Sequence, residues 1–303
     1  MKSLKLKRQT PADVVFNIFL TIFMLALVVV TMYPILNTVA ISFNDGTDTL
    51  RGGIYLWPRV PTWYNYQSIF KTANLSQAFI VSIARTVIGS VLNVFCTAMV
   101  AYTLTKKDFV FRKAITLLYV LTMYVGAGLI PGYLLNKNLH LINSFWVYII
   151  PGLVSAFDLI IVRTYMKSIP GSLVESAQID GAGEFTIFIK IMLPLAAPVL
   201  ATIALFCAVG QWNSWFDTFI YNGNNKNLTT LQYELMKALS TAMSQGGGSN
   251  AQYIANADTA ANQVTPMSIR AAITVVAAVP ILCVYPFLQK YFVQGMTLGS
   301  VKE

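Results

Sequence analysis

Charged residues divide this chain into six apolar segments, and most of these are long enough to cross a bilayer. A spanning helix needs about 20 consecutive, mainly apolar residues. The segments cover residues 14–36, 79–104, 114–136, 144–162, 196–221 and 271–287. The fourth and sixth are short and contain proline or glycine, so their bounds are the least sharply defined. The pattern predicts an all-α integral membrane protein with six transmembrane helices.

The composition agrees with a membrane protein and argues against a nucleic-acid partner. Only 11% of the residues are charged and 56% are apolar, whereas a soluble domain has roughly 25% charged residues. The net charge is +9, but the basic residues are scattered between apolar segments. A nucleic-acid surface gathers them in a basic patch with aromatic residues among them. We therefore expect a lipid membrane around the chain and no nucleic acid.

Residues for catalysis or metal binding are scarce. Cys96, Cys207 and Cys283 each lie in an apolar segment and indicate buried small hydrophobes, with no disulfide framework or metal spacing. His140 is the only histidine, which excludes histidine zinc sites and a Ser-His-Asp triad. The sequence lacks the glycine-rich lysine loop of an ATP site. We expect no catalytic residue, no metal site and no cofactor here, so ATP and Mg would belong to a partner ATPase.

Lysine and arginine counts predict the orientation in the membrane. Six spans place thirteen of these residues on the side of the termini and seven on the other side. Cytoplasmic flanks carry the excess of positive charge, so both termini are expected in the cytoplasm. Residues 1–303 then form a single transmembrane domain with outer loops 37–77 and 222–270 and a cytoplasmic loop 163–195. The first span has no cleavage signal after it and is expected to be retained.

The two outer loops differ in character. The loop 37–77 combines turn signals with tryptophan and tyrosine residues. The loop 222–270 begins with an asparagine-rich turn, and its leucines predict a short helix after it. These leucines, near helical spacing, are Leu228, Leu231, Leu235 and Leu239. The glycine-rich tract 246–250 is typical of a flexible linker.

The cytoplasmic loop contains a predicted helix–turn–helix. Ser172 and Glu175 have the spacing of a capping box, which predicts the start of a short helix. Gly181, after Asp180, predicts a turn with positive φ at its end. A second helix should begin near Glu184 and end before Pro194. The loop is either a passive connector or a rigid element that docks on a partner, and its cytoplasmic placement favours docking.

Three charged residues lie within or at the margins of the predicted spans, namely Arg85, Asp158 and Asp217. A charge at the centre of a spanning helix costs about 2.5–3.5 kcal/mol on insertion scales, so such residues usually face a cavity or one another. We hypothesise that at least one of them lines a translocation path. The alternative for Arg85 and Asp217 is that they reach the interface by snorkelling, and Asp158 could face the inner interface or a neighbouring helix.

An aromatic and polar run in the fifth span provides candidate substrate contacts. It contains Trp212, Asn213, Trp215 and Asp217. Rings beside amide and carboxylate groups suit sugars, whose C–H faces stack on rings while their hydroxyls pair with polar groups. The alternative is an aromatic belt at the membrane interface. Neutral polar groups outnumber charges in the spans, which fits an uncharged, hydroxyl-rich cargo.

The loop motif also resembles that of a known family. The pattern E-[A/S]-A, three residues, G, nine residues, I-x-L-P begins at Glu175 without a gap, with Ser176 where the family usually has alanine. With segments 128–135, 194–217 and 290–296, it resembles the MalG-like carbohydrate ABC permeases of the LplC/YtcP type. The resemblance implies an ABC importer permease fold of type I (MetI-like). It also implies an ATPase-coupling set: Ser172, Glu175, Ser176, Ala177, Asp180, Gly181, Ile191, Leu193 and Pro194.

The resemblance further implies the partners and the location. They are a second permease subunit in a heterodimer, two ABC ATPase subunits, an extracellular solute-binding protein and an oligosaccharide substrate. The location is the cell membrane, with several passes. The rivals are a permease of the same machinery for a non-sugar solute, a secondary transporter or channel driven by an ion gradient, and a membrane scaffold that transports nothing. No residue selects a particular sugar.

Overall fold

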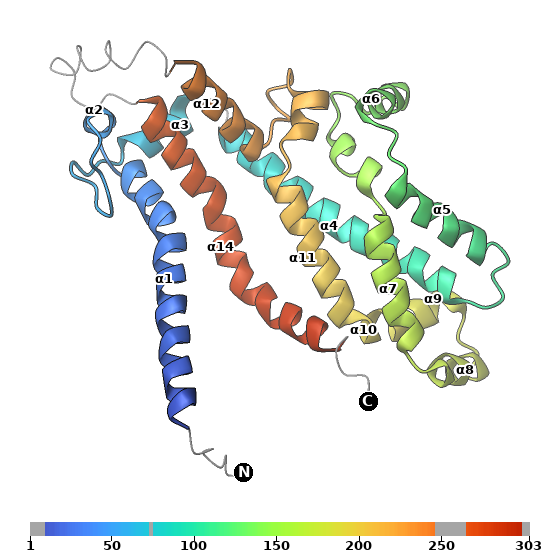
Figure 1. The fold of residues 1–303 in the computed structure, drawn as a ribbon. Coiled ribbons are helices and arrows are strands. Elements are labelled where there is room, and N and C mark those ends of the chain that lie inside the picture. Colours follow the sequence, from blue (N-terminus) through green and yellow to red (C-terminus); the bar gives the residue numbers. More distant parts are fainter. Residues whose placement is uncertain (1–9, 73–74, 246–264, 299–303) are drawn as a thin grey trace. The chain divides into compact units, whose positions relative to one another are not determined.

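The computed structural model describes residues 10–72, 75–245 and 265–298 (Figure 1). Within this part of the chain the structure is helical apart from turns, connecting segments and one isolated β-bridge between Asn44 and Pro61. The chain divides into two compact units, each described here by itself. The first comprises residues 1–69 and 238–275, and the second comprises residues 70–237 and 276–303.

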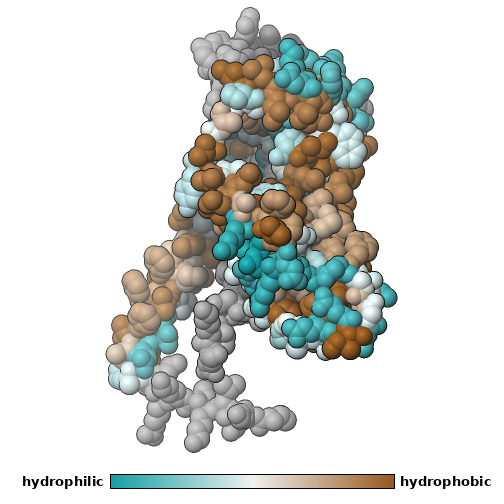
Figure 2. All heavy atoms as spheres, turned by 90° about the vertical axis from the view of Figure 1, so that its right-hand side faces the viewer, coloured by the Kyte–Doolittle hydropathy of each residue, from teal (hydrophilic) through white to brown (hydrophobic). Residues whose placement is uncertain are grey.

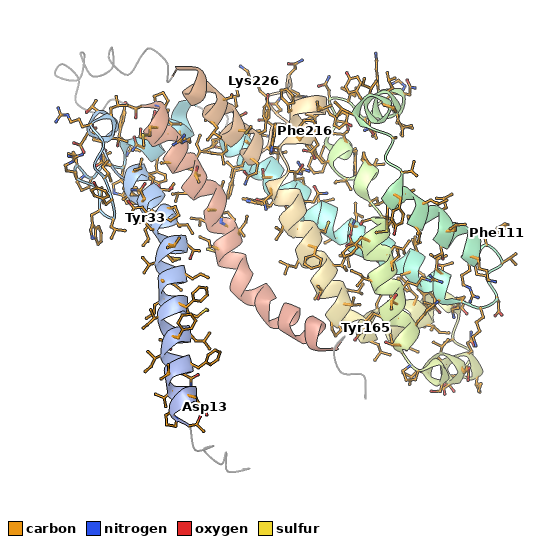
Figure 3. All side chains as sticks on the ribbon, in the orientation of Figure 1. Asp13, Tyr33, Phe111, Tyr165, Phe216 and Lys226 are labelled. Carbon is orange, nitrogen blue, oxygen red and sulfur yellow. The ribbon has the colours of Figure 1, made fainter. Side chains whose placement is uncertain are left out.

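The first unit begins with the long helix α1, Pro11–Ser42. Its start is a capping box: the Asp13 backbone N–H donates to Thr10 Oγ1 at 3.3 Å, and the Thr10 N–H donates to Asp13 Oδ2 at 2.9 Å. Its most apolar window has a mean hydropathy of 2.7 and no buried residue. Figure 3 shows side chains standing out from α1 between Asp13 and Tyr33. Such a helix needs lipid around it, as the first predicted span requires.

The segment after α1 is an ordered fold around one buried amide. It carries the short helices α2, Gly46–Leu50, and α3, Tyr64–Thr72. Asn44 is fully buried, and its Nδ2 donates to Asp48 Oδ2 at 3.0 Å. Its Oδ1 accepts the Val60 N–H at 2.8 Å. Through Asn44 these bonds connect Asp48 with Val60, which lie before and after a predicted turn, so this loop has a defined structure.

The second unit is built around α4, Leu75–Thr105. It packs along α11, Ala197–Asn213, and along α7, Ala156–Ser168. Small residues of α4 such as Ala98 and Ala101 are fully buried against Val162 and Ile203 of these neighbours. Small side chains let helices approach closely inside a membrane. This three-helix contact is the core of the unit.

The third predicted span, 114–136, is not one helix. The structure has α5, Arg112–Tyr124, then a non-helical break at residues 125–128, then α6, Leu129–Asn138. Gly128 precedes α6 with φ +82°, a conformation that suits glycine and interrupts an α-helix. Residues 125–128 contain no charged or polar side chain, so the hydropathy of the sequence did not reveal the break.

The fourth predicted span is bent, and a bend precedes the fifth. The fourth consists of the 3₁₀ turns η1, Phe145–Tyr148, and η2, Ile150–Gly152, followed by α7 at 51°. Before the fifth, α9, Glu184–Ile187, leads through two short pieces to α11, which turns by 79°. These pieces are the π-helical η3, Phe188–Met192, and α10, Leu193–Leu195.

The remaining helices are α12 and α14, together with the π-helical η4 after α11. Their bounds are Leu231–Gln245 for α12, Pro266–Leu298 for α14 and Thr218–Asn222 for η4. Leu228 lies before α12 and the other three leucines lie within it, while the tract 246–250 is outside the described residues. Three described helices are long and apolar enough to cross a membrane, or up to five elements if each bent pair is one span.

The surface reflects the expected environment. Figure 2 shows the face that lies on the right in Figure 1, where hydrophobic residues cover much of the area and hydrophilic residues form patches at the top and in the lower half. Exposed large apolar side chains are frequent on α4 and α5, among them Val91 at 63% and Leu118 at 61% exposure. Water-facing surfaces rarely carry apolar areas of this extent, so this face belongs in lipid.

Candidate functional site

The predicted helix–turn–helix is present, and residues 171–187 are here called the elbow. It consists of α8, Gly171–Ile179, a turn, and α9. The predicted capping box is wrong: the N-cap is Pro170, and no side chain caps the helix. The helix begins at Gly171, so Ser172 is already a helical residue and cannot act as the cap. Proline fixes φ near the helical value and prepares a helix start without a side-chain cap.

The predicted turn at the end of α8 is confirmed. Gly181 has φ +78°, and its N–H donates to the Gln178 carbonyl at 3.0 Å. The Ala182 N–H donates to the Ala177 carbonyl at 2.9 Å. These two bonds form a Schellman motif, which satisfies the last carbonyls of the helix and sets the direction of the chain. The angle between α8 and α9 is therefore defined by backbone hydrogen bonds.

The elbow has one face packed on the second unit and one face open. Ala177, Ile191 and Leu193 of the predicted coupling set are half-buried against the core. The other members are exposed: Ser172, Glu175, Ser176, Asp180, Gly181 and Pro194. Two large apolar side chains are also open, Ile179 at 85% and Phe185 at 68% exposure. The sequence pattern did not mark Ile179 or Phe185 as site residues, although Ile179 precedes Asp180 and Phe185 follows Glu184.

A carboxylate at the start of α9 joins the elbow to the end of α4. Glu184 Oε2 accepts the Tyr102 hydroxyl at 2.6 Å and lies 2.6 Å from Lys106 Nζ. Glu184 Oε1 accepts Gln178 Nε2 at 3.1 Å. The hydrogen bond from Lys106, followed by that from Tyr102, holds the pKa of Glu184 below its ordinary value. Glu184 is therefore charged near neutral pH.

A second polar site lies inside the helix bundle, around Arg85 of α4. Its Nε and Nη2 donate to Gln211 Oε1 at 3.0 and 2.8 Å. Its Nη1 and Nη2 bond the two oxygens of Asp217, at 3.2 and 2.5 Å. The guanidinium carbon also lies 4.3 Å from the centre of the Tyr148 ring. Only 2% of the Arg85 side chain is exposed, so snorkelling does not account for it.

Local structure prepares this cluster. One turn after Arg85, α4 has Gly89, where a Cβ would lie 3.1 Å from Gln211 Nε2. Glycine there lets Gln211 lie against α4 and reach the guanidinium. At the end of α11, Ser214 Oγ donates to Asp217 Oδ1 at 2.9 Å, which orients the carboxylate. Gln211 and Tyr148 were not predicted as site residues, although Gln211 begins the polar run of the fifth span.

The cluster borders a cavity of about 420 Å³ between α4, α7 and α11. Asp158 lines the same cavity, so the structure brings together the three intramembrane charges of the sequence. Asn93 is 4% exposed, and its Nδ2 donates to the Gly152 carbonyl at 3.1 Å. Among the described residues, no group pairs with Asn93 Oδ1. A buried amide oxygen without a partner calls for a donor from water or a ligand.

The predicted aromatic contacts lie elsewhere. Trp212, Asn213 and Trp215 are not among the cavity-lining residues. Trp212 is 6% exposed, and its Nε1 donates to the Ala277 carbonyl at 3.0 Å. Trp215 packs edge-on against Phe216 with ring centres 5.6 Å apart, near the end of α11 (Figure 3). Of the four predicted contacts in this run, only Asp217 borders the cavity, together with its neighbours Gln211 and Ser214.

These features define a class of protein before any comparison: a multi-pass helical transport subunit with an intramembrane cavity and an exposed elbow. Comparison with known families agrees. Residues 86–298 match the family described as "Binding-protein-dependent transport system inner membrane component". This is more than half of the chain, and the chain belongs to that family.

Two curated relatives are from Bacillus subtilis (strain 168). Protein LplC is 36% identical over the full length of both chains. The polygalacturonan/rhamnogalacturonan transport system permease protein YtcP is 34% identical, over 95% of this chain and 98% of its own. A solved chain of a bacterial ABC transporter involved in the import of the acidic polysaccharide alginate has a TM-score of 0.84 at 28% identity, covering 94% of this chain and 99% of that one. This chain is a membrane transport permease, and not an enzyme.

Because the Arg85 cluster is buried, we expect the loss of one partner to lower the free energy of unfolding substantially. We expect Arg85→Leu to destabilise the protein by about 3–5 kcal/mol, because the Asp217 charge is left inside the bundle without its counter-ion. Arg85→Leu/Asp217→Leu should recover part of that loss. Thermal unfolding of the purified protein in detergent measures both.

The matched control for this test is the ion pair between Arg59 and Asp48, whose arginine side chain is 51% exposed. Arg59→Leu should cost less than Arg85→Leu, because Arg59 is half exposed and Asp48, although buried, keeps the hydrogen bond from Asn44 Nδ2 at 3.0 Å. Equal destabilisation by Arg59→Leu and Arg85→Leu would contradict the assignment of Arg85 as a buried tie between α4 and α11.

Proposed function

We propose that this chain is one permease subunit of an ATP-driven sugar importer, with the elbow as its contact to a separate ATPase. The observation that carries the proposal is the open face of the elbow. Ile179 and Phe185 are large, apolar and exposed beside Glu175 and Asp180. A hydrophobic centre with a polar rim is the anatomy of a protein-binding surface.

The elbow is suited to receive a push without unfolding. The Schellman motif at Gly181 holds the turn, and Ala177 and Ala182 pack the inner face onto the core. Displacement of α8 therefore moves the helices that follow it. ATP hydrolysis is assigned to the partner, because the sequence has no phosphate-binding loop of its own.

We extend the proposal to topology and assembly. Six spans with both termini in the cytoplasm would place the elbow on the ATPase side, as the distribution of lysine and arginine predicts. The bent pair that ends in α7 would count as one span, α11 as another without the elbow helix α9, and α5 with α6 as a broken one. A second permease subunit, two ATPase subunits and an extracellular binding protein would complete the importer, and the family description supports the binding protein.

The proposed cargo is an oligosaccharide that passes the cavity beside Arg85. Among the described residues that line the cavity, Arg85 is the only cationic one, and Asp217 pairs with it. Asp158 and the free Asn93 Oδ1 remain as acceptors for hydroxyl groups. This lining favours an uncharged sugar over a uronic-acid chain, since a carboxylated cargo would meet Asp158 without a free cation. Trp212, Asn213 and Trp215 would contact the cargo outside this cavity, since none of them lines it.

Reconstitution tests this function. The chain is expressed with its ATPase, its second permease subunit and its binding protein, and the complex is purified and placed in proteoliposomes. We expect one stable assembly and uptake of labelled oligosaccharide that requires ATP, with a neutral oligosaccharide preferred to an oligogalacturonate. Activity of the lone chain driven by an ion gradient would favour a secondary transporter. ATP-driven uptake of a peptide or an ion in place of any sugar would favour a non-sugar permease.

Gly181 provides a test of the elbow itself. Gly181→Pro should abolish uptake while the protein still inserts, because proline cannot adopt φ +78° and lacks the N–H that donates to Gln178. Gly181→Ala should cost about 1–2 kcal/mol in the same turn, and its effect is purely conformational, since a Cβ there meets nothing within 4 Å.

Gly183 offers the matched control, because it lies two residues away at φ −70° and a Cβ there also has open space. Gly183→Ala should therefore transport normally. Normal uptake by Gly181→Pro, measured at equal amounts of membrane-inserted protein, would show that the turn is a passive connector.

A further inference from the structure

The contact between the elbow and α4 has an unusual composition for a surface ion pair. Glu184 is bonded on both oxygens, and its three donors come from two different elements. Tyr102 and Lys106 belong to α4 and to the residue just after it, while Gln178 belongs to α8. We call Tyr102, Lys106, Gln178 and Glu184 the junction.

The junction is anchored in the core on one side. Tyr102 is 6% exposed, and its ring lies 5.5 Å from that of Phe188, which follows α9. Lys106 Nζ lies 4.6 Å from the centre of the Tyr102 ring. The Lys106 side chain is 24% exposed and that of Glu184 is 58% exposed. An isolated exposed pair contributes about 1 kcal/mol at most, so the burial of Tyr102 distinguishes this contact from an ordinary surface pair.

The chain connects the elbow covalently to α7 on one side and, through η3 and α10, to α11 on the other. It has no covalent connection to α4 nearby in the sequence, since more than sixty residues separate Lys106 from Gly171. The junction supplies the hydrogen bonds and the ion pair between the end of α4 and the elbow. Apolar contacts of Tyr102 and its neighbours on α4 with Ile187 and Phe188 lie beside them.

We propose that Glu184 is a positioning residue that transmits movement of the elbow to α4. This rests on the proposed function, because it assumes that the elbow receives the push. Arg85 lies on the same helix, about 25 Å from Tyr102 at 1.5 Å per residue. Movement of α4 would therefore reach the wall of the cavity directly, beside the routes through α7 and α11.

The test is the ratio of sugar transported to ATP hydrolysed in the reconstituted importer. For Glu184→Ala we expect a loss in this ratio, because ATP hydrolysis continues in the partner while movement of the elbow no longer reaches α4. A purely structural defect would lower assembly and both activities together and leave the ratio unchanged. Activities are therefore expressed per assembled complex.

The chain offers matched controls next to the junction. Lys106→Ala should lower the ratio, whereas Lys107→Ala at the neighbouring exposed position should not. Asp108→Ala, an exposed acidic residue in the same connection, should also leave the ratio unchanged. Lys106→Glu/Glu184→Lys should recover part of the ratio, because the attraction is restored with its direction reversed. If Glu184→Ala fails to assemble, Tyr102→Phe removes one hydrogen bond with the ring in place and should lower the ratio to a smaller extent.

The outcomes separate the two proposals. A wild-type importer with ATP-driven sugar uptake, together with unchanged ratios in Glu184→Ala, or in Tyr102→Phe where Glu184→Ala does not assemble, would overturn the role of Glu184 and leave the function intact. A wild-type complex without ATP-driven sugar uptake would overturn the function itself. A lowered ratio in the junction variants, with wild-type ratios in Lys107→Ala and Asp108→Ala, would establish the link.

Discussion

The arrangement of the second unit depends on one constraint: a charged side chain inside a lipid-embedded bundle must be paired or face a cavity. Arg85 meets it by bonding Gln211 and Asp217 at once, which ties α4 to α11 and to the residues that follow it. Helix α4 then carries two polar ties, one at Arg85 in its first half and one at Tyr102 near its end. These ties fix the position of α4 against α11 and against the elbow.

This view joins the two sites of the molecule. The cavity borders α4, α7 and α11, and the elbow is continuous with α7 and with the segment that leads to α11. The junction at Glu184 adds α4 to the same set. The three helices α4, α7 and α11 therefore contribute both to the lining of the cavity and to the contacts or continuation of the elbow.

Much of the fold could be predicted from the apolar pattern where that pattern coincides with helix geometry. Residues 14–36 and 79–104 lie in single helices because no glycine or proline in them changes the backbone enough to break the helix. Residues 114–136 do not, because Gly128 adopts positive φ within a stretch that is still apolar. Hydropathy records the environment of a segment, and it does not record the backbone conformation at a single residue.

Parts of the site could be predicted where a local pattern or the cost of a charge in lipid marks a residue. The positive φ of Gly181 followed from local turn chemistry, and the intramembrane charges Arg85, Asp158 and Asp217 followed from their cost in lipid. The capping role of Ser172 was wrong because Pro170 starts the helix earlier. Glu184 and Tyr102 are 82 residues apart in sequence, and no local pattern relates them. Contacts of that kind depend on the packing of helices, which a single sequence does not display.

The central claim is that the open face of the elbow contacts an ATPase in the cytoplasm. Site-specific crosslinking tests it most directly. Ile179→Cys is introduced after replacement of Cys96, Cys207 and Cys283, with Trp57→Cys as the exposed control on the opposite predicted side. The account predicts a disulfide or bifunctional adduct between position 179 and the ATPase, with position 57 labelled by a membrane-impermeant thiol reagent from outside. Labelling of position 179 from outside intact cells, or its failure to crosslink to the ATPase in the assembled complex, would contradict the account.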